Sequence, residues 1–188
     1  MLQVSRCFKF VDLYFYAFHA GNKLSTRSGK VGIVPHKYNS IAVGGTFDQI
    51  HGGHRTLLKR AFDTSELVII GLTSDAFAAS EGKKLDHSFE YRRNQLSKYL
   101  AQNFPGREYT ITKLEARFGK GIFTRNIEAI AVSTETFPSV RDANDKRRQL
   151  GLPEMKVEVV PLVVTQDGQK ISSTRIRAGE IDEEGRPK

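Results

Sequence analysis

One stretch near residue 45 constrains the fold more than any other part of the chain. An apolar segment at 41–43 runs directly into Gly44-Gly45-Thr46, and a segment with helical spacing follows at 55–62. A strand, a glycine-rich turn and a helix in this order present free backbone N–H groups and the positive end of a helix dipole to an anion. His51 and His54 lie in the same turn. The stretch therefore predicts a phosphate site, of the kind that binds nucleotides, in an α/β protein.

Apolar runs and amphipathic stretches alternate along the rest of the chain. We expect strands at 66–72, 109–114, 127–133 and 157–164, and helices at 88–102 and 140–150. Pro161 within the last run indicates an edge strand or a bulge, because proline cannot donate to a sheet ladder. Strands that alternate with helices predict a doubly wound α/β fold with a mostly parallel sheet.

Sheets of this kind bind their ligands beyond the carboxyl ends of the strands. Four polar segments follow predicted strands or open the last predicted helix: 44–54, 73–75, 133–137 and the segment around Ser172. We expect all four to meet at one mouth of the sheet.

Length and charge indicate one domain at 41–188 behind an extension at 1–40. The 188 residues suffice for one sizeable core and are too few for two ordinary domains. The net charge is +8, but residues 1–40 hold six Lys and Arg against one Asp, so residues 41–188 carry only +3. Basicity in this place is weak support for a nucleic-acid partner, and none is expected.

The extension is aromatic and apolar at 8–18 and polar beyond. The apolar run is shorter than the roughly 20 residues of a membrane helix, Lys9 and Asp12 interrupt it, and no A-x-A cleavage site follows. Three interpretations stay open: a poorly ordered appendage or overextended start, a segment packed on the domain, or an anchor to a membrane or partner. Cys7 is the only cysteine, which excludes an intrachain disulfide and favours a cytoplasmic location.

A few side chains decide the chemistry of the turn. The stretch lacks both the G-x-G-x-x-G pattern of dinucleotide sites and the G-x-x-x-x-G-K-[ST] pattern of a P-loop. Thr46 offers a hydroxyl donor, and the first helical turn brings His51 and His54 to the same side. The histidines alone are also compatible with surface or capping residues or a metal pair, but no other histidine has supporting spacing, so no metal held by the protein is expected. Together with Asp48 and Gly53, they favour a bound phosphate.

Two motifs resemble the signatures of the nucleotidyltransferase superfamily. GGTFD at 44–48 with HGGH at 51–54 resembles its T/H-x-G-H signature, and ISSTRIR at 171–177 resembles I-S-S-T-x-I-R. The segments that connect the two motifs are similar to those of the archaeal and eukaryotic type of phosphopantetheine adenylyltransferase. These segments are VIIGLTSD at 68–75, Lys83-Lys84 before the predicted helix that contains Arg92, and VSTET at 132–136 followed by 144–152. The resemblance covers residues 41 to about 181 and implies a Rossmann-like nucleotidyltransferase fold.

The resemblance implies an enzyme that transfers AMP from ATP to 4'-phosphopantetheine, giving dephospho-coenzyme A and pyrophosphate. It implies His54 as the catalytic residue, assisted by His51. The implied ATP-binding residues are Gly45, Thr46, Phe47, Ser172, Ser173, Thr174 and Arg177. Thr46 and Lys84, or its neighbour Lys83, are implied to bind phosphopantetheine. Mg²⁺ is the implied cofactor, bound mainly through the ATP phosphates.

Some of these residues have other interpretations. Lys83 and Lys84 are compatible with solvated loop charges, and Ser172-Ser173-Thr174 with a plain helix cap. The arginines of the two long predicted helices are expected on solvated faces: Arg92, Arg93 and those between 141 and 148. The bacterial branch of the family has an arginine after the fourth strand, where this chain has STET at 133–136, and the group that replaces it is open.

The two signatures do not by themselves select the acceptor. Nicotinamide or nicotinate mononucleotide adenylyltransferases have closely similar motifs, and a noncatalytic nucleotide-binding module is the alternative from a different class. The expected partners are the small molecules ATP and 4'-phosphopantetheine, without nucleic acid or membrane. The sequence is compatible with a monomer or a homo-oligomer.

Overall fold

The computed structural model describes residues 36–188. Their centre is a sheet of five strands in the order β3-β2-β1-β4-β5, in which all neighbours are parallel. The strands are β1 (Tyr38–Gly45), β2 (Ser65–Thr73), β3 (Glu108–Leu114), β4 (Ala129–Ser133) and β5 (Lys156–Val160). The predicted doubly wound α/β fold is confirmed, and the sheet is parallel throughout.

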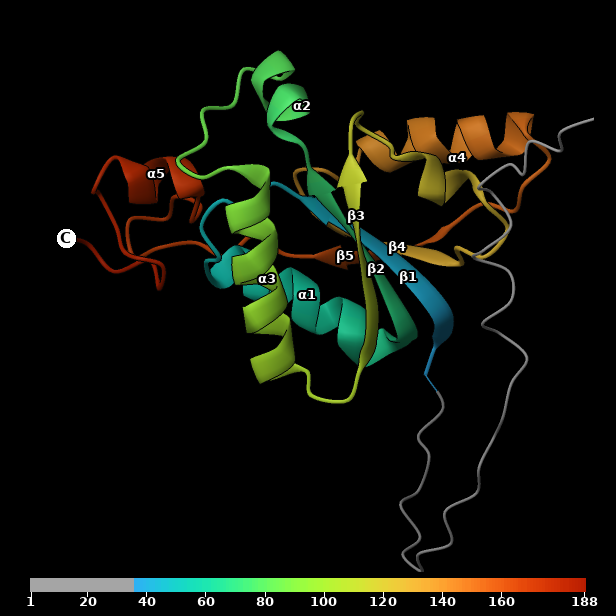
Figure 1. The fold of residues 1–188 in the computed structure, drawn as a ribbon, viewed down its shortest axis with the longest axis horizontal. Coiled ribbons are helices and arrows are strands. Elements are labelled where there is room, and N and C mark those ends of the chain that lie inside the picture. Colours follow the sequence, from blue (N-terminus) through green and yellow to red (C-terminus); the bar gives the residue numbers. More distant parts are fainter. Residues whose placement is uncertain (1–35) are drawn as a thin grey trace, which may run out of the picture. The chain divides into compact units, whose positions relative to one another are not determined.

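Helices cover both faces of the sheet (Figure 1). They are α1 (Gly52–Thr64), α2 (Asp75–Ser80), α3 (Phe89–Asn103), α4 (Ser139–Gln149) and α5 (Ser173–Arg177), with a 3-10 turn, η2 (Lys120–Phe123). Side chains of α1 and α3 share a core with one face of the sheet, and those of α4 share a second core with the other face. Successive strand residues point to opposite faces, so Ile41 and Val43 enter the first core and Ala42 enters the second.

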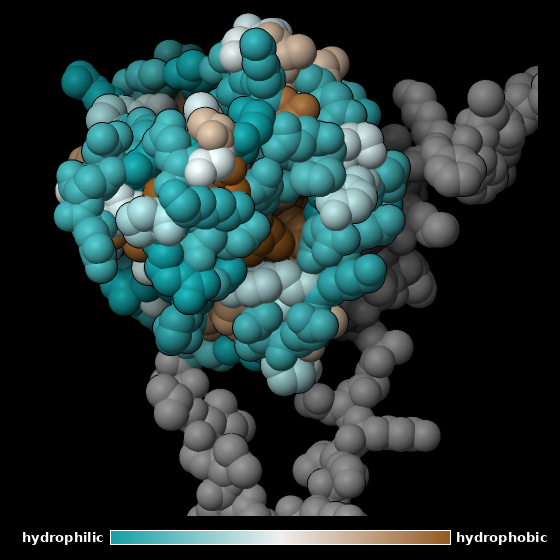
Figure 2. All heavy atoms as spheres, turned by 90° about the vertical axis from the view of Figure 1, so that its left-hand side faces the viewer, coloured by the Kyte–Doolittle hydropathy of each residue, from teal (hydrophilic) through white to brown (hydrophobic). Residues whose placement is uncertain are grey.

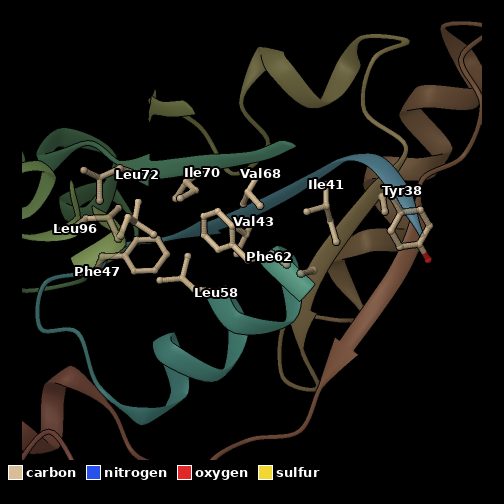
Figure 3. Packing of buried hydrophobic residues seen from close by; sticks show 14 residues of the cluster. Tyr38, Ile41, Val43, Phe47, Leu58, Phe62, Val68, Ile70, Leu72 and Leu96 are labelled. Atoms are coloured by element: carbon tan, nitrogen blue, oxygen red, sulfur yellow. The ribbon is translucent and has the colours of Figure 1, made fainter. Parts of the chain in front are cut away.

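The larger core lies between the sheet and helix α1 (Figure 3). Leu58 and Phe62 of α1 lie beneath Val43 of β1. Phe47, two residues beyond the end of β1, is only 1% exposed and enters the same core near Leu96 of α3. The turn that follows β1 is therefore anchored in the core by its own aromatic side chain.

Strand β1 starts at Tyr38, three residues before the boundary expected at residue 41. Lys37 Nζ and the Tyr38 hydroxyl donate to Oε1 of Glu158 in β5, at 2.6 and 2.8 Å. Arg60 of α1 donates to the other oxygen of the same carboxylate at 2.8 Å. Residues 37–40 are thus tied to the sheet and to α1.

The interpretations of the rest of the extension fall on residues 1–35, outside the described residues. No helix in the part of the chain that the structure describes is long and apolar enough to cross a membrane.

Strand β5 is an edge strand, as Pro161 indicated, but it is shorter than predicted. It ends at Val160, because Pro161 has no N–H to continue the ladder. The predicted continuation to residue 164 is wrong, and Val164 instead forms an isolated antiparallel bridge with Lys170.

Two helix arginines are wholly buried, so the prediction of solvated faces is wrong for Arg92 and Arg147. Arg147 has no carboxylate partner among the described residues and donates to backbone carbonyls, including that of Pro153 at 2.7 Å and that of Ile127 at 3.0 Å. A buried guanidinium is tolerated where its N–H groups are satisfied in this way. Arg93 is exposed, as expected.

Candidate active site

A cleft of about 940 Å³ opens at the carboxyl ends of the strands. Its walls come from the segments after β1, β4 and β5, the loop after α2 and the residues around α5. Figure 2 views the molecule from the side on which α5 lies in Figure 1, and shows hydrophilic residues around a hollow with hydrophobic atoms at its bottom. Residues from all four segments expected at one mouth line the cleft, although Thr73 alone represents the segment 73–75.

His51 caps helix α1, and His54 lies in its first turn. Nδ1 of His51 accepts the N–H of Gly53 at 3.2 Å, which leaves the ring proton on Nε2. Nδ1 of His54 lies 3.1 Å from the carbonyl oxygen of Gln49, so this nitrogen carries the proton and Nε2 is an acceptor in the neutral ring. The two rings stack with centroids 4.0 Å apart, and both line the cleft. The structure thus brings the two predicted catalytic residues together in opposite tautomers.

Both imidazoles are neutral in the cleft without a ligand. Burial and the positive charge of Arg55 lower the pKa of His51 to about 4. Desolvation and the neighbouring His51 lower the pKa of His54 to about 3. A triphosphate acts in the opposite direction, because nearby negative charge favours the imidazolium. An anionic ligand in the cleft would therefore favour protonation of His54 at Nε2.

The turn after β1 offers backbone groups to a ligand. Phe47 has a φ of 46°, and no other non-glycine residue in the described part of the chain has a positive φ. Its ring lies against Gly45, where a Cβ would come within 3.0 Å of the aromatic carbons. Gly45 and Thr46 line the cleft, whereas the Phe47 side chain points into the core. Of the three predicted ATP-binding residues here, Gly45 and Thr46 therefore line the cleft and Phe47 does not.

A residue from each signature hydrogen-bonds to the same backbone carbonyl group. Ser172 caps α5 by accepting the N–H of Arg175 at 3.3 Å, as the capping interpretation predicted. Ser173 Oγ donates to the carbonyl oxygen of Gln49 at 3.5 Å, the oxygen that also accepts from His54. Ser172, Ser173 and Thr174 all line the cleft. Both signatures therefore form parts of one site, although more than a hundred residues separate them.

Arg177 also lines the cleft, and two carboxylates hold it. It donates to Asp48 at 3.0 Å and to Asp86 at 2.7 Å. Asp48 also accepts the backbone N–H groups of Asp86 and His87. Burial by itself would raise the pKa of Asp48, but the Asp86 amide, Arg177 and His87 together lower it. The ionised Asp48 thereby fastens the 81–88 loop and Arg177 to the turn.

That loop carries Lys83 and Lys84. Both side chains are exposed and both line the cleft, so each can reach a ligand there, and the predicted contact with the acceptor phosphate stays a prediction. The backbone N–H of Lys83 donates to the carbonyl of Ala78 at 2.9 Å, which ties the start of the loop to α2.

Two further cations in the cleft wall were missed by sequence reasoning. Lys170 forms an ion pair with Glu135 in the segment after β4, where the bacterial branch has an arginine. Arg117 pairs with Glu81 at 3.2 Å. No local pattern signals either residue, because each partner lies about 35 positions away in the sequence.

Metal-binding side chains are sparse around the cleft. Within residues 36–188, no group of three or more His, Cys, Asp and Glu lies close enough to hold a metal ion. Asp48, the carboxylate of the turn, is already engaged by Arg177 and backbone amides. The cleft thus offers cations and N–H donors, which fit an anionic ligand.

Known proteins share both the sequence pattern and this fold. Residues 42–179 match the cytidylyltransferase-like family. The phosphopantetheine adenylyltransferase of Methanopyrus kandleri is 39% identical over 147 residues, which cover 78% of this chain and 93% of the relative. That of Methanothermobacter thermautotrophicus is 43% identical over 149 residues, covering 79% and 89%. A solved structure of a protein of unknown function from Archaeoglobus fulgidus is 26% identical with a TM-score of 0.59, covering 71% of this chain and 99% of that one. The chain therefore belongs to the cytidylyltransferase-like family and, within it, to the phosphopantetheine adenylyltransferases.

Proposed function

We propose that this chain transfers the adenylyl group of ATP to 4'-phosphopantetheine, giving dephospho-coenzyme A and pyrophosphate. The main support for the proposal is that His54 of the first signature and Ser173 of the second both hydrogen-bond to the carbonyl of Gln49 in the cleft. The chain is also about 40% identical to phosphopantetheine adenylyltransferases. The chemistry is an in-line attack of an acceptor phosphate oxygen on the α-phosphorus of ATP. As the new P–O bond forms, the bond to the bridging oxygen breaks and pyrophosphate leaves with the electron pair.

The attacking phosphate is already an anion, so the reaction needs no strong base. Catalysis then depends on positioning and on stabilising the charge that develops on the α-phosphoryl oxygens. His54 donates from Nε2 to an α-phosphate oxygen once it is protonated, and His51 donates from the Nε2 proton that its cap bond leaves in place. Gly45, Thr46 and the backbone of Phe47 hold the phosphates against the start of α1, where the helix dipole favours negative charge.

The residues around α5, on another wall of the cleft, bind the β- and γ-phosphates. Ser172 and Thr174 supply hydroxyl donors to the β- and γ-phosphates, and Ser173 joins them once its hydroxyl leaves the Gln49 carbonyl. Arg177 adds positive charge once a phosphate competes with its carboxylate partners. Lys84, or Lys83, neutralises the phosphate of the acceptor.

The cleft also has an apolar part that fits the flexible arm of phosphopantetheine. Leu114, Phe118, Ile122 and Val132 lie in its lining, together with Leu57 and Ile130. An extended arm buries its methylene groups against such a surface, and its amide groups find polar partners at the rim.

Mg²⁺ fits this site as an ion that ATP carries. When bound with ATP, it would neutralise part of the phosphate charge. Asp48 remains a structural anchor. The proposal includes no protein ligand for the ion.

We also propose that the protein acts in the cytoplasm on small molecules alone. The basic excess of residues 1–40 lies apart from the cleft residues in the sequence, and residues 41–188 carry a net charge of only +3. A nucleic-acid or membrane partner has no other support in the described residues.

The acceptor is tested directly. The protein is incubated with Mg²⁺ and ATP and offered 4'-phosphopantetheine or nicotinamide mononucleotide in separate reactions, with pyrophosphate release and product mass as readouts. We expect dephospho-coenzyme A from the first acceptor. Release only with the mononucleotide would support that alternative, which the names of the relatives do not favour, and release with neither would support a noncatalytic module.

A further inference from the structure

We propose that Arg92 is a positioning residue that aims the backbone of the phosphate-binding turn at ATP. The residue lies on α3, outside the cleft lining, and is fully buried. The inference rests on the proposed function, since it explains how the turn is held ready for a phosphate.

The guanidinium of Arg92 joins three segments that surround the turn. Nη1 donates to the carbonyl of Thr46 at 2.5 Å, and Nε donates to the carbonyl of His87 at 3.2 Å. Nη2 donates to the carbonyl of Thr73 at 2.8 Å and to Oδ1 of Asp75 at 2.6 Å. The end of β2, the loop that carries Lys83 and Lys84, and the phosphate-binding turn are thus fixed to one planar group.

The bond to Thr46 sets the direction of a peptide. In a trans peptide the C=O and the following N–H point to opposite sides. Because Arg92 holds the Thr46 oxygen on the side of α3, the N–H of Phe47 is turned away from it. No hydrogen bond between described residues uses this N–H as a donor. Phe47 does not line the cleft, whereas Thr46, the other residue of this peptide, does. The orientation that Arg92 imposes on the peptide therefore decides how the turn faces the cleft at Thr46.

A second contact restrains the preceding peptide in the same way. The hydroxyl of Thr73 donates to the carbonyl oxygen of Gly45 at 3.1 Å. Thr73 and Arg92 thus donate hydrogen bonds to two successive carbonyl groups of the turn, those of Gly45 and Thr46. The N–H groups of the same two peptides, on Thr46 and Phe47, are therefore directed away from these donors.

The turn needs such a restraint because its backbone is strained. Phe47 adopts a φ of 46°, which bulky residues rarely adopt and which persists only where the surroundings enforce it. Its buried ring fixes one side of the peptide, and Arg92 fixes the other. Lysine cannot replace the arginine, because a single ammonium cannot match a planar fork that reaches four acceptors in three segments.

Arg147 provides a matched control for this inference. It is equally buried and also satisfies backbone carbonyls, but its partners belong to the 122–127 segment and to Pro153. Arg92→Lys and Arg147→Lys are expected to lower the denaturation midpoint alike. Only Arg92→Lys is expected to weaken ATP binding, by about tenfold or more, as for the loss of a hydrogen bond that orients a charged ligand.

Calorimetric titration with ATP and with adenosine, both without acceptor, separates positioning from general damage. Loss of ATP affinity with unchanged adenosine affinity supports the proposal, because the proposed function places the phosphates, and not the nucleoside, at the turn. Equal ATP affinity in the two arginine variants, or a parallel loss for adenosine, overturns it. The readout needs no acceptor, so an unexpected acceptor for the unaltered protein would contradict the proposed function and leave this test intact.

A second variant decides the question if Arg92→Lys does not fold. Asp75→Ala removes a half-exposed carboxylate that orients Nη2 and lies outside the cleft. We expect a folded protein with ATP affinity lowered by about threefold and adenosine affinity unchanged. Unchanged ATP affinity in the folded Asp75→Ala protein contradicts the proposal.

Discussion

The imidazole rings of His51 and His54 stack at 4.0 Å with their protons on opposite nitrogens. The cap bond to Gly53 leaves the His51 proton on Nε2, whereas the carbonyl of Gln49 holds the His54 proton on Nδ1. His51 is thus a donor in its neutral form. His54 becomes a donor at Nε2 only after it gains a second proton.

This relationship predicts that ATP binding takes up a proton. The pKa of His54 is lowered to about 3 without a ligand, so the ring is neutral at pH 7. Phosphate charge raises this pKa towards the pH of the solution, and the complex therefore holds more protons than the free protein. Calorimetry in buffers of different ionisation enthalpy measures the uptake, which should be larger at pH 6 than at pH 8. His54→Asn should abolish it and His51→Asn should retain it. The reverse pattern, or no uptake in the unaltered protein, contradicts the assignment of tautomers.

Replacing His54 with alanine should lower kcat by about 10² or more and leave the fold intact. This loss is comparable to the removal of one preorganised donor to a transition-state oxyanion. Steady-state kinetics and the far-UV circular dichroism spectrum measure the two effects. His36→Ala is the control, because His36 does not line the cleft. A loss below about fivefold with a native spectrum excludes His54 as the principal donor.

We expect a substitution in the 81–88 loop, which carries Lys83 and Lys84, to change the kinetics for the acceptor and not the binding of ATP. Lys84→Ala should lower kcat/KM for phosphopantetheine by about tenfold or more, as expected for the loss of a charge-assisted phosphate contact. The Kd of ATP should change little. Lys98→Ala, at an exposed position of α3, serves as the control. If Lys83→Ala shows the larger loss, the role belongs to Lys83, and if neither variant does, both lysines are solvated loop charges.

The sequence was sufficient to predict the architecture because each strand and helix has a recognisable local pattern of apolar and polar residues. The apolar runs that became β1, β2 and β4 are short and continuous, as buried parallel strands are, and glycine or proline marks the ends of several elements. Residues of both signatures line the cleft, as expected because the strand order brings the carboxyl ends together, although Phe47 does not.

Side chains whose partners are distant in the sequence were not predictable. Arg92 and Arg147 have the spacing of charged helix residues, and only the tertiary structure shows that backbone carbonyls surround them. The meeting of His54 and Ser173 at the Gln49 carbonyl likewise depends on a contact across 124 positions. Sequence periodicity tells which face of a helix is buried but not which acceptors a buried cation will find there.

The last prediction concerns Glu158, which is 3% exposed and receives hydrogen bonds from Lys37, Tyr38 and Arg60. Glu158→Gln should lower the free energy of unfolding by about 2 kcal/mol at pH 7, because an amide has one acceptor oxygen for three donors. Burial by itself would raise the pKa of this carboxyl, but the three donors lower it below its ordinary value.

The sign of the pH dependence follows from that direction. As the pH falls below the ordinary glutamate value of 4.5, the unfolded chain binds a proton first, so the stabilisation by Glu158 is present above that pH and is lost as the pH falls through the lower, folded value. Urea denaturation should therefore show a difference between the two proteins that is constant above pH 6 and narrows in acid. Glu154→Gln, which alters an exposed pair with Arg148, should have a much smaller effect at every pH. A difference that stays the same from pH 7 to pH 3 would mean that the carboxylate charge of Glu158 does not stabilise the fold, and that Lys37 and Tyr38 hold β1 in place by packing alone.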